Sequence, residues 1–428
     1  GYSSGQVFGD DYPEMIAGFE SDVVSLDSLE CFSRPTDLYQ RYRSRIESLP
    51  GLRLIYGANC TGIRLDDGAS SVDRLQMSTL DGKAFDVRCS NYVLAAGGIE
   101  TTRLLLASND VCAAGVGNQN DLVGRYYMCH VAGNVGRLKF DLPLDSVRHG
   151  YEVSDDGVYC RRRIMLSEAE QRRQESNNVV MRLHFPRVAD PAHKSGVLSF
   201  IYLMKPFISY EYGTRLRDGD GDSLSSYLGH FRNVILSPLE TARFGFRWIA
   251  KRNLATRKFP SIILENKSNL FSLEINAEQC PRYDSRVYLS DERDELGMPR
   301  VVIDWKYSKQ DIESVGKTLD TFAAELQRLG IGTLEYERDD LDAAMLRFGA
   351  YGGHHIGTTR MGEDPAESVV DTNCRVHSTD NLFIASSSVF PTSSQANPTL
   401  AITALAVRLA DHLDQALRSH ATSGQVAA

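Results

Sequence analysis

The sequence lacks three features that would each point to a particular class of protein: paired cysteines, a long apolar run and a basic cluster. Its eight cysteines are scattered singly without a C-x-x-C pair, so neither a zinc site nor a disulfide framework is indicated. No apolar run reaches the roughly 20 residues that a membrane helix needs. The formal charge of -9 and the absence of long Lys and Arg runs give no reason to expect a nucleic acid partner.

The first residues of the chain lack both a Met and a signal-peptide pattern. Positions 1–11 do not show a basic stretch followed by an apolar one. Dispersed thiols in a chain of this length are typical of a reducing compartment, so a cytoplasmic location is expected. The absence of Met leaves open that the original N-terminus lies upstream of Gly1.

The N-terminal third alternates between helical and extended patterns. Apolar spacing predicts a short amphipathic helix at 37–48 and a strand at 52–65. Residues 72–89 favour a hairpin that turns at Asp81-Gly82. Residues 91–108 combine a short apolar strand, a Gly-Gly turn and a helix, which is the strand-turn-helix unit of a parallel sheet.

The middle of the chain, roughly 135 to 310, favours an antiparallel sheet in a second domain. A mixed aromatic and basic stretch at 205–260 indicates core or a lid with helices, rather than a membrane element. Ser308 caps a long amphipathic helix at 308–329, with Asp311 three positions on as in a capping box. The strands expected in this sheet are 197–204, 269–276, 285–290 and 299–305.

The C-terminal seventy residues hold most of the chemistry-bearing positions. Residues 351–362 place His354 and His355 among glycines, where the imidazoles can reach a cleft. Residues 381–417 predict a buried strand, a small-residue turn, a loop and an apolar helix with Asn397 as N-cap. The free amides of such a helix start favour a negative charge. By itself this pattern leaves open an anion site or an ordinary capped helix.

Several motifs in this region resemble the signature of the glucose-methanol-choline (GMC) oxidoreductase family. They occur in the family's order over about sixty residues. The resemblance extends upstream to 58–65 and 91–108, which are similar to strands of the family's flavin domain. Residues 273–308 are similar to the substrate domain of bacterial members related to sugar (pyranose) oxidases. The C-terminal motifs are HHIGTTRMG (354–362), VVD (369–371), residues 381–392 and NPT (397–399).

The resemblance implies an enzyme that uses FAD to oxidise an alcohol to a carbonyl, with a sugar or glycoside hydroxyl as the expected substrate. His354 takes the family's position of the base, because a neutral imidazole can accept the hydroxyl proton while hydride leaves for flavin N5. Asn397 takes the position that orients the same oxygen, and the helix after it would stabilise the reduced flavin. The implied FAD-contacting positions are Cys60, Ala95, Ala96, Gly97, His355, Ala385, Ser386, Pro398 and Thr399.

The implied fold is α/β with mixed α+β character. A partial Rossmann-like FAD domain would comprise 1–135 and 345–428, and an antiparallel-sheet substrate domain would comprise 136–344. The FAD domain is expected to be discontinuous and incomplete, because no G-x-G-x-x-G turn follows a strand; the nearest glycine cluster, 115–124, has the wrong spacing. Ser386 also departs from the family, many members of which carry Asp there.

The missing glycine turn leaves three possibilities for the flavin site: the segment lies upstream, a second chain supplies it, or it has been lost. Two further functions therefore stay open beside alcohol oxidation. One is a flavin-dependent lyase of the same fold, which performs no redox step. The other is a half-enzyme subunit that completes the flavin site of a partner chain.

Overall fold

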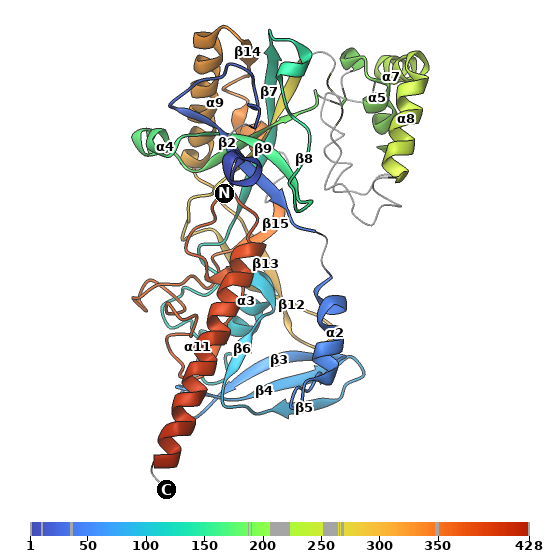
Figure 1. Cartoon of the computed structure of the whole chain (residues 1–428). Helices are drawn as coiled ribbons and strands as arrows, with labels where there is room; N and C mark the ends of the chain where they lie inside the picture. Colours follow the sequence, from blue (N-terminus) through green and yellow to red (C-terminus); the bar gives the residue numbers. More distant parts are fainter. Residues whose placement is uncertain are drawn as a thin grey trace. The chain divides into compact units, whose positions relative to one another are not determined.

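The computed structural model describes residues 2–9, 12–34, 37–186, 188–189, 191–205, 223–250, 264, 266, 269–346 and 351–426 (Figure 1). The chain divides into two compact units, each built from three segments. The first unit comprises Gly1–Leu52, Ala132–Asn276 and Ser314–Phe348. The second comprises Arg53–Val131, Ala277–Glu313 and Gly349–Ala428.

The first unit is built on a large sheet whose described neighbours run in the order β1-β2-β9-β10-β11-β7-β14. The pairings of β2 with β9, β9 with β10 and β7 with β14 are antiparallel. Its strands are β1 (Tyr2–Ser3), β2 (Val24–Phe32), β7 (Met128–Phe140, which begins in the second unit), β8 (Glu152–Val153), β9 (Tyr159–Leu166), β10 (Val179–His184), β11 (Leu270–Ala277) and β14 (Gly332–Glu335).

Helix α9, which begins in the second unit and continues in the first, follows the sequence pattern closely. Its N-terminal capping box is present, since Asp311 N donates to Ser308 Oγ at 3.2 Å and Ser308 N donates to Asp311 Oδ2 at 2.7 Å. The helix is amphipathic as predicted, and Leu319, Phe322 and Leu326 on its apolar face are fully buried. The helices are α1 (Ser4–Phe8), α2 (Leu38–Ser48), α4 (Glu168–Gln174), α5 (Gly196–Leu203), α7 (Leu224–Leu236), α8 (Pro238–Trp248), α9 (Lys309–Leu329) and α10 (Leu341–Leu346).

The strand predicted at 197–204 is wrong, because this segment forms helix α5. Ser195 caps the helix by accepting a hydrogen bond from Leu198 N. A continuous apolar run of eight residues carries no periodicity that separates a buried strand from a buried helix. The lid-like stretch predicted at 205–260 falls partly outside the described residues; its described part forms α7 and α8 (Figure 1).

The second unit contains a parallel strand pair and two small antiparallel sheets. Strand β6 pairs in parallel with β16, and Ala385 N extends the pairing by donating to Leu94 O at 2.8 Å. The hairpin predicted at 72–89 is confirmed as β4 and β5, with Gly82 at a φ of +88° in the turn. The elements are β3 (Ala58–Leu65), β4 (Val72–Thr79), β5 (Ala84–Val87), β6 (Tyr92–Leu94), α3 (Gly97–Ala107), β12 (Arg286–Arg293), β13 (Pro299–Asp304), β15 (Tyr351–Ile356), β16 (Leu382–Ile384), the 3-10 turn η5 (Ser387–Val389) and α11 (Thr399–Val426).

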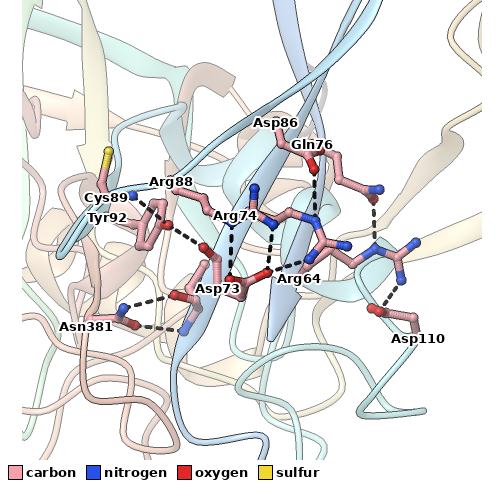
Figure 2. A network of polar contacts seen from close by, with 11 residues as sticks. Arg64, Asp73, Arg74, Gln76, Asp86, Arg88, Cys89, Tyr92, Asp110 and Asn381 are labelled. Carbon is pink, nitrogen blue, oxygen red and sulfur yellow. Dashed lines mark hydrogen bonds and ion pairs between the residues drawn. The ribbon is translucent and has the colours of Figure 1, made fainter. Parts of the chain in front are cut away.

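A polar network joins the hairpin of the second unit to its parallel strands (Figure 2). Asn381 accepts a hydrogen bond from Val72 N at 2.8 Å and donates to Val72 O at 3.0 Å. The hydroxyl of Tyr92 accepts from Cys89 N and donates to Asp73 O, each at 2.9 Å. These bonds hold the start of β4 against the first residues of β6 and β16.

The observed units differ from the predicted domain boundaries in two places. Residues 1–52 belong with the large sheet, because β2 pairs with β9. Residues 277–313 belong with the second unit, because the β12–β13 hairpin packs on α3, where Arg103 Nε donates to Pro299 O at 2.7 Å. Both differences arise from pairing between segments far apart in sequence, which local patterns do not encode.

None of the eight cysteines, all of which lie in the described part of the chain, forms a disulfide. Two of them are nevertheless neighbours, since Cys31 and Cys160 face each other across β2 and β9 with their Sγ atoms 3.7 Å apart. Among the helices that the structure describes, none is long and apolar enough to cross a bilayer.

Candidate active site

The two histidines predicted to carry the chemistry lie on β15, which runs antiparallel to the start of β7. Tyr351 is opposite His130, and Ile356 is opposite Met128. The register slips between these pairs, where Gly353 adopts a φ of +62° that L-residues rarely adopt. A slip of this kind redirects side chains locally, and strand irregularities often occur beside functional sites.

His354 has the properties of a base that is neutral at physiological pH. Its side chain is half-buried, and Nδ1 is a buried atom without a hydrogen-bond partner among the described residues. Burial, together with the neighbouring His355, holds the pKa of His354 below its usual value. The imidazole is therefore able to accept a proton near neutral pH.

His355 is held by hydrogen bonds to both its ring and its backbone. Its Nδ1 shares a hydrogen bond of 2.8 Å with the hydroxyl of Tyr127, and its carbonyl accepts from Ser387 Oγ at 2.6 Å. Gly98 lies so close that a Cβ there would be 2.7 Å from the same carbonyl oxygen. These contacts hold β15 firmly against α3 and η5, so His355 supports the position of its neighbour; its contact with a flavin stays a prediction.

Asn397 lies just outside helix α11, with an exposed side chain. The helix begins at Thr399, and Ile402 N donates to Pro398 O at 2.9 Å, so Asn397 is not the N-cap predicted from the sequence. Its amide is therefore not committed to capping and is available to a substrate oxygen. Pro398 is buried and Thr399 is exposed.

The strand ends predicted to contact the cofactor lie side by side. Ala95 follows β6 and Ala385 follows β16, so the parallel pairing brings these two positions together. Ala95, Ala96 and Gly97 are exposed, and the N-cap of α3 is Ala96, which has no side chain able to cap the first turn. An exposed, small-residue edge leading into an uncapped helix start fits the close approach of an anionic cofactor such as FAD.

Two of the residues predicted to contact FAD, Ser386 and Cys60, are less exposed than Ala95 to Gly97. Ser386 is buried, and its hydroxyl accepts from Ser388 N at 3.1 Å to cap η5. Cys60 lies on β3, where its half-buried side chain packs against the hydrophobic core and burial raises the pKa of its thiol. The glycines at 115–124 serve packing, since a Cβ on Gly124 would meet Val287 O.

Two buried residues near the site were not predicted from the sequence. The ring of His130 meets that of His354 edge to face, with centroids 4.8 Å apart and planes at 74°. Gln279 Oε1 accepts from Cys129 N at 2.9 Å, and Gln279 N donates to Ser393 Oγ at 3.0 Å, which joins β7 to the loop before Asn397. His130 lies in no motif, and Gln279 lies within the family-like segment 273–308 at a position to which the resemblance assigns no role. Only the folded arrangement reveals their contacts.

Residues 281–406 match the family model described as GMC oxidoreductase. This stretch is similar to the GMC oxidoreductases. It includes both His354 and Asn397, and it confirms the family predicted from the C-terminal motifs. The mixed fold, with a parallel strand pair and an antiparallel sheet, is likewise confirmed.

The relatives that the chain matches are named as oxidases and dehydrogenases. Paromamine 6'-oxidase of Streptomyces fradiae is 35% identical over 160 residues, covering 35% of this chain and 28% of that protein. C-glycoside 3-oxidase of Arthrobacter globiformis is 36% identical over 146 residues, or 33% and 26% of the two chains. The fructose dehydrogenase large subunit of Gluconobacter japonicus is 24% identical over 349 residues, or 81% and 51%. The chain thus spans about half or less of the relatives it matches.

Proposed function

We propose that this chain oxidises a hydroxyl group of a sugar or glycoside to a carbonyl, with FAD as cofactor. The observation that carries the proposal is the state of His354, whose half-buried imidazole has a lowered pKa. It lies on strand β15, within the stretch that matches the GMC family model. The sugar class is supported by the names of three relatives, which act on paromamine, C-glycosides and fructose. A cytoplasmic location stays a prediction.

His354 would take the hydroxyl proton of the alcohol, and the amide of Asn397 would hold the same oxygen in place. FAD, when bound, supplies a hydride acceptor at its N5 atom. The exposed Ala95, Ala96 and Gly97 would hold the cofactor, and the first turn of α11 would favour negative charge beside it. Because the pKa of His354 is depressed, the ring is ready to accept the proton near pH 7.

Anaerobic titration of the flavin-loaded protein with sugars and glycosides tests this proposal. Bleaching of the visible flavin absorption by one of these compounds, with a carbonyl product in equal amount, is the expected result. A lyase would convert its substrate without bleaching, so turnover without bleaching would contradict the proposed oxidation. Flavin-loaded protein that stays oxidised with every sugar, glycoside and simple alcohol would contradict it as well.

We also propose that a further strand and helix complete the flavin site. A parallel sheet of two strands is too small to be stable alone, and Val93 on β6 is 44% exposed. Helix α11 leaves Leu400 and Val407 exposed at 74% and 58%. An upstream segment of the same protein, or a partner chain, would cover these residues.

Flavin binding by the isolated chain tests the completion of the site. We expect the purified chain to be colourless with FAD alone and to acquire flavin absorption when a longer form or a partner chain provides the missing unit. Tight, stoichiometric FAD binding by residues 1–428 alone would overturn this part of the proposal.

A further inference from the structure

Cys31 and Cys160 lie directly opposite each other in the large sheet of the first unit. Cys31 is on β2 and Cys160 is on β9, and the two residues are register partners in this antiparallel pair. Their Sγ atoms are 3.7 Å apart, and the thiol of Cys160 donates to the sulfur of Cys31. Because the two cysteines are 129 positions apart in the sequence, their spacing gave no sign of this pairing.

The register that brings the two thiols together is held on both sides. Glu30 is opposite Arg161 and Phe32 is opposite Tyr159, so the cysteines lie within a continuous stretch of strand pairing. Arg182 adds an ion pair with Glu30, in which Nε and Oε2 are 2.7 Å apart. A slip by one residue would turn one cysteine to the other face of the sheet, and these neighbours oppose such a slip.

The backbone at this position suits a disulfide. Residues directly opposite each other in an antiparallel pair have Cα atoms about 4.5 or 5.5 Å apart, which lies within the range of about 4.4–6.8 Å found in disulfides. The two sulfurs are already in contact, and a bond would bring them to about 2.05 Å. Rotation of the two side chains with a small approach of the strands achieves this, so no rearrangement of the sheet is required.

The two thiols differ in their access to solvent. Cys160 is fully buried, whereas Cys31 is half-buried. Burial, together with the hydrogen bond that it donates to Cys31, raises the pKa of Cys160 to about 12, so this residue stays a thiol at neutral pH. A dissolved oxidant would therefore react first at Cys31.

We propose that Cys31 and Cys160 form a reversible oxidation site, at which a hydroperoxide converts the two thiols into a disulfide that fastens β2 to β9. The sulfur of Cys31 attacks the O–O bond of the hydroperoxide, which breaks to give a sulfenic acid at Cys31 and releases water or an alcohol. The sulfur of Cys160 then attacks the sulfur of Cys31. The S–O bond breaks, and the departing hydroxide takes the thiol proton of Cys160 and leaves as water. Two electrons thus pass from the thiols to the hydroperoxide, and a dithiol reverses the change by exchange.

The disulfide would change how firmly the N-terminal segment is held. Strand β2 pairs with β1 as well as with β9, and the residues that follow it lead to Arg53, where the second unit begins. A covalent link near the end of β2 would keep this strand on the sheet when its pairing opens locally. This inference is independent of the proposed oxidation of an alcohol.

Mass spectrometry of the peroxide-treated chain tests the proposal. The reduced 428-residue chain is treated with hydrogen peroxide, unfolded, alkylated and digested without reductant. We expect a pair of peptides linked through Cys31 and Cys160 and the loss of two of the eight thiols, both reversed by dithiothreitol. If Cys31 does not react, or if Cys160 is still alkylated once Cys31 has reacted, the proposal is wrong. This measurement needs no variant.

Two substitutions separate the roles of the two thiols. In Cys160→Ser, the sulfenic acid at Cys31 has no opposing thiol to condense with, so dimedone should capture it. In Cys31→Ser, the buried Cys160 should stay a thiol. Cys89→Ser, at an exposed position, is the matched control and should form the disulfide as the wild type does. Capture by dimedone at Cys160 in Cys31→Ser would overturn the assignment of Cys31 as the residue that reacts first.

Hydrogen exchange of the oxidised and reduced chains tests whether the bond fastens the strand. Peptides from β2 should exchange at least about tenfold more slowly in the oxidised chain, because a disulfide typically stabilises a folded chain by more than this factor. Peptides from β12 and β13, which belong to the second unit, should exchange at the same rate in both forms. Equal exchange of β2 in the two forms would overturn the fastening of β2 to β9.

Discussion

A hydrogen bond of 2.8 Å joins the hydroxyl of Tyr127 to Nδ1 of His355, while the adjacent His354 keeps a buried Nδ1 without a partner among the described residues. Burial raises the pKa of Tyr127, so this hydroxyl stays protonated and its bond to His355 persists at high pH. The ring of His355 is thus held in place by a hydrogen bond, whereas the ring of His354 can exchange a proton.

His354→Ala should abolish flavin reduction by substrate while leaving flavin occupancy unchanged, because it removes the proton acceptor and little else. Stopped-flow spectroscopy of the anaerobic, flavin-loaded protein measures the reduction rate, and the flavin-to-protein absorbance ratio measures occupancy. We expect a loss of at least about a hundredfold. Near-normal reduction would remove His354 from the role of base.

Gln279→Leu should destabilise the second unit by about 3 kcal/mol or more. The side chain is fully buried, and its loss would leave Cys129 N, Trp305 Nε1 and Lys306 O without their present partner. Urea unfolding compared with the wild type measures the change. Gln415→Ala, at an exposed position of α11, is the control and should fall within about 0.5 kcal/mol of wild type; a cost below 1 kcal/mol at Gln279 would show that the loop is held otherwise.

Gly98→Ala should weaken the site more than its size suggests. The added Cβ would lie 2.7 Å from the backbone oxygen of His355, which can move only if β15 moves. We expect a loss of about 1–3 kcal/mol in unfolding free energy and slower flavin reduction. Gly245→Ala, in helix α8 with open space around it, should be neutral or stabilise by up to about 1 kcal/mol; equal effects at both glycines would contradict the close approach at Gly98.

Folding stability should fall between pH 6.5 and pH 4 because of His130. Its pKa is 6.5 in the unfolded chain and about 4 when folded, mainly through burial. Above pH 6.5 the ring of His130 is neutral in both the folded and the unfolded chain. Between pH 6.5 and pH 4 the unfolded chain binds a proton at this ring and the folded chain does not, so the free energy of unfolding decreases as the pH falls through this window. The full shift corresponds to about 3 kcal/mol. Urea unfolding at several pH values should give a shallower decline for His130→Phe than for wild type; parallel curves would contradict the lowered pKa.

Local sequence patterns predicted the secondary structure correctly wherever the structure of a segment depends on its own residues. The capping box of Ser308 and Asp311, the turn at Gly82 and the strand-turn-helix at 91–108 were all predicted, because each depends on residues a few positions apart. Segment 197–204 was not, since a uniformly apolar run suits both helix and strand.

Some residues of the candidate site could be predicted from the sequence, and others could not. His354 and Asn397 lie in ordered motifs, so the resemblance to a family located them. His130 and Gln279 owe their importance to neighbours more than a hundred residues away, such as His354 and Ser393, and no periodicity marks them. The N-cap assigned to Asn397 was wrong for a local reason, because helix α11 begins beyond Pro398.

The two bonds between Asn381 and Val72 also bear on the order of folding. They join residues 309 positions apart, and they close a unit whose first segment ends at Val131 and whose last begins at Gly349. During synthesis at roughly 5–20 residues per second, Val72 at the start of β4 must wait on the order of ten seconds or more for its partner Asn381. Strand β6 also lacks its parallel partner β16 in that interval. Folding of this protein is therefore expected to depend on chaperones more than its stability when folded would suggest.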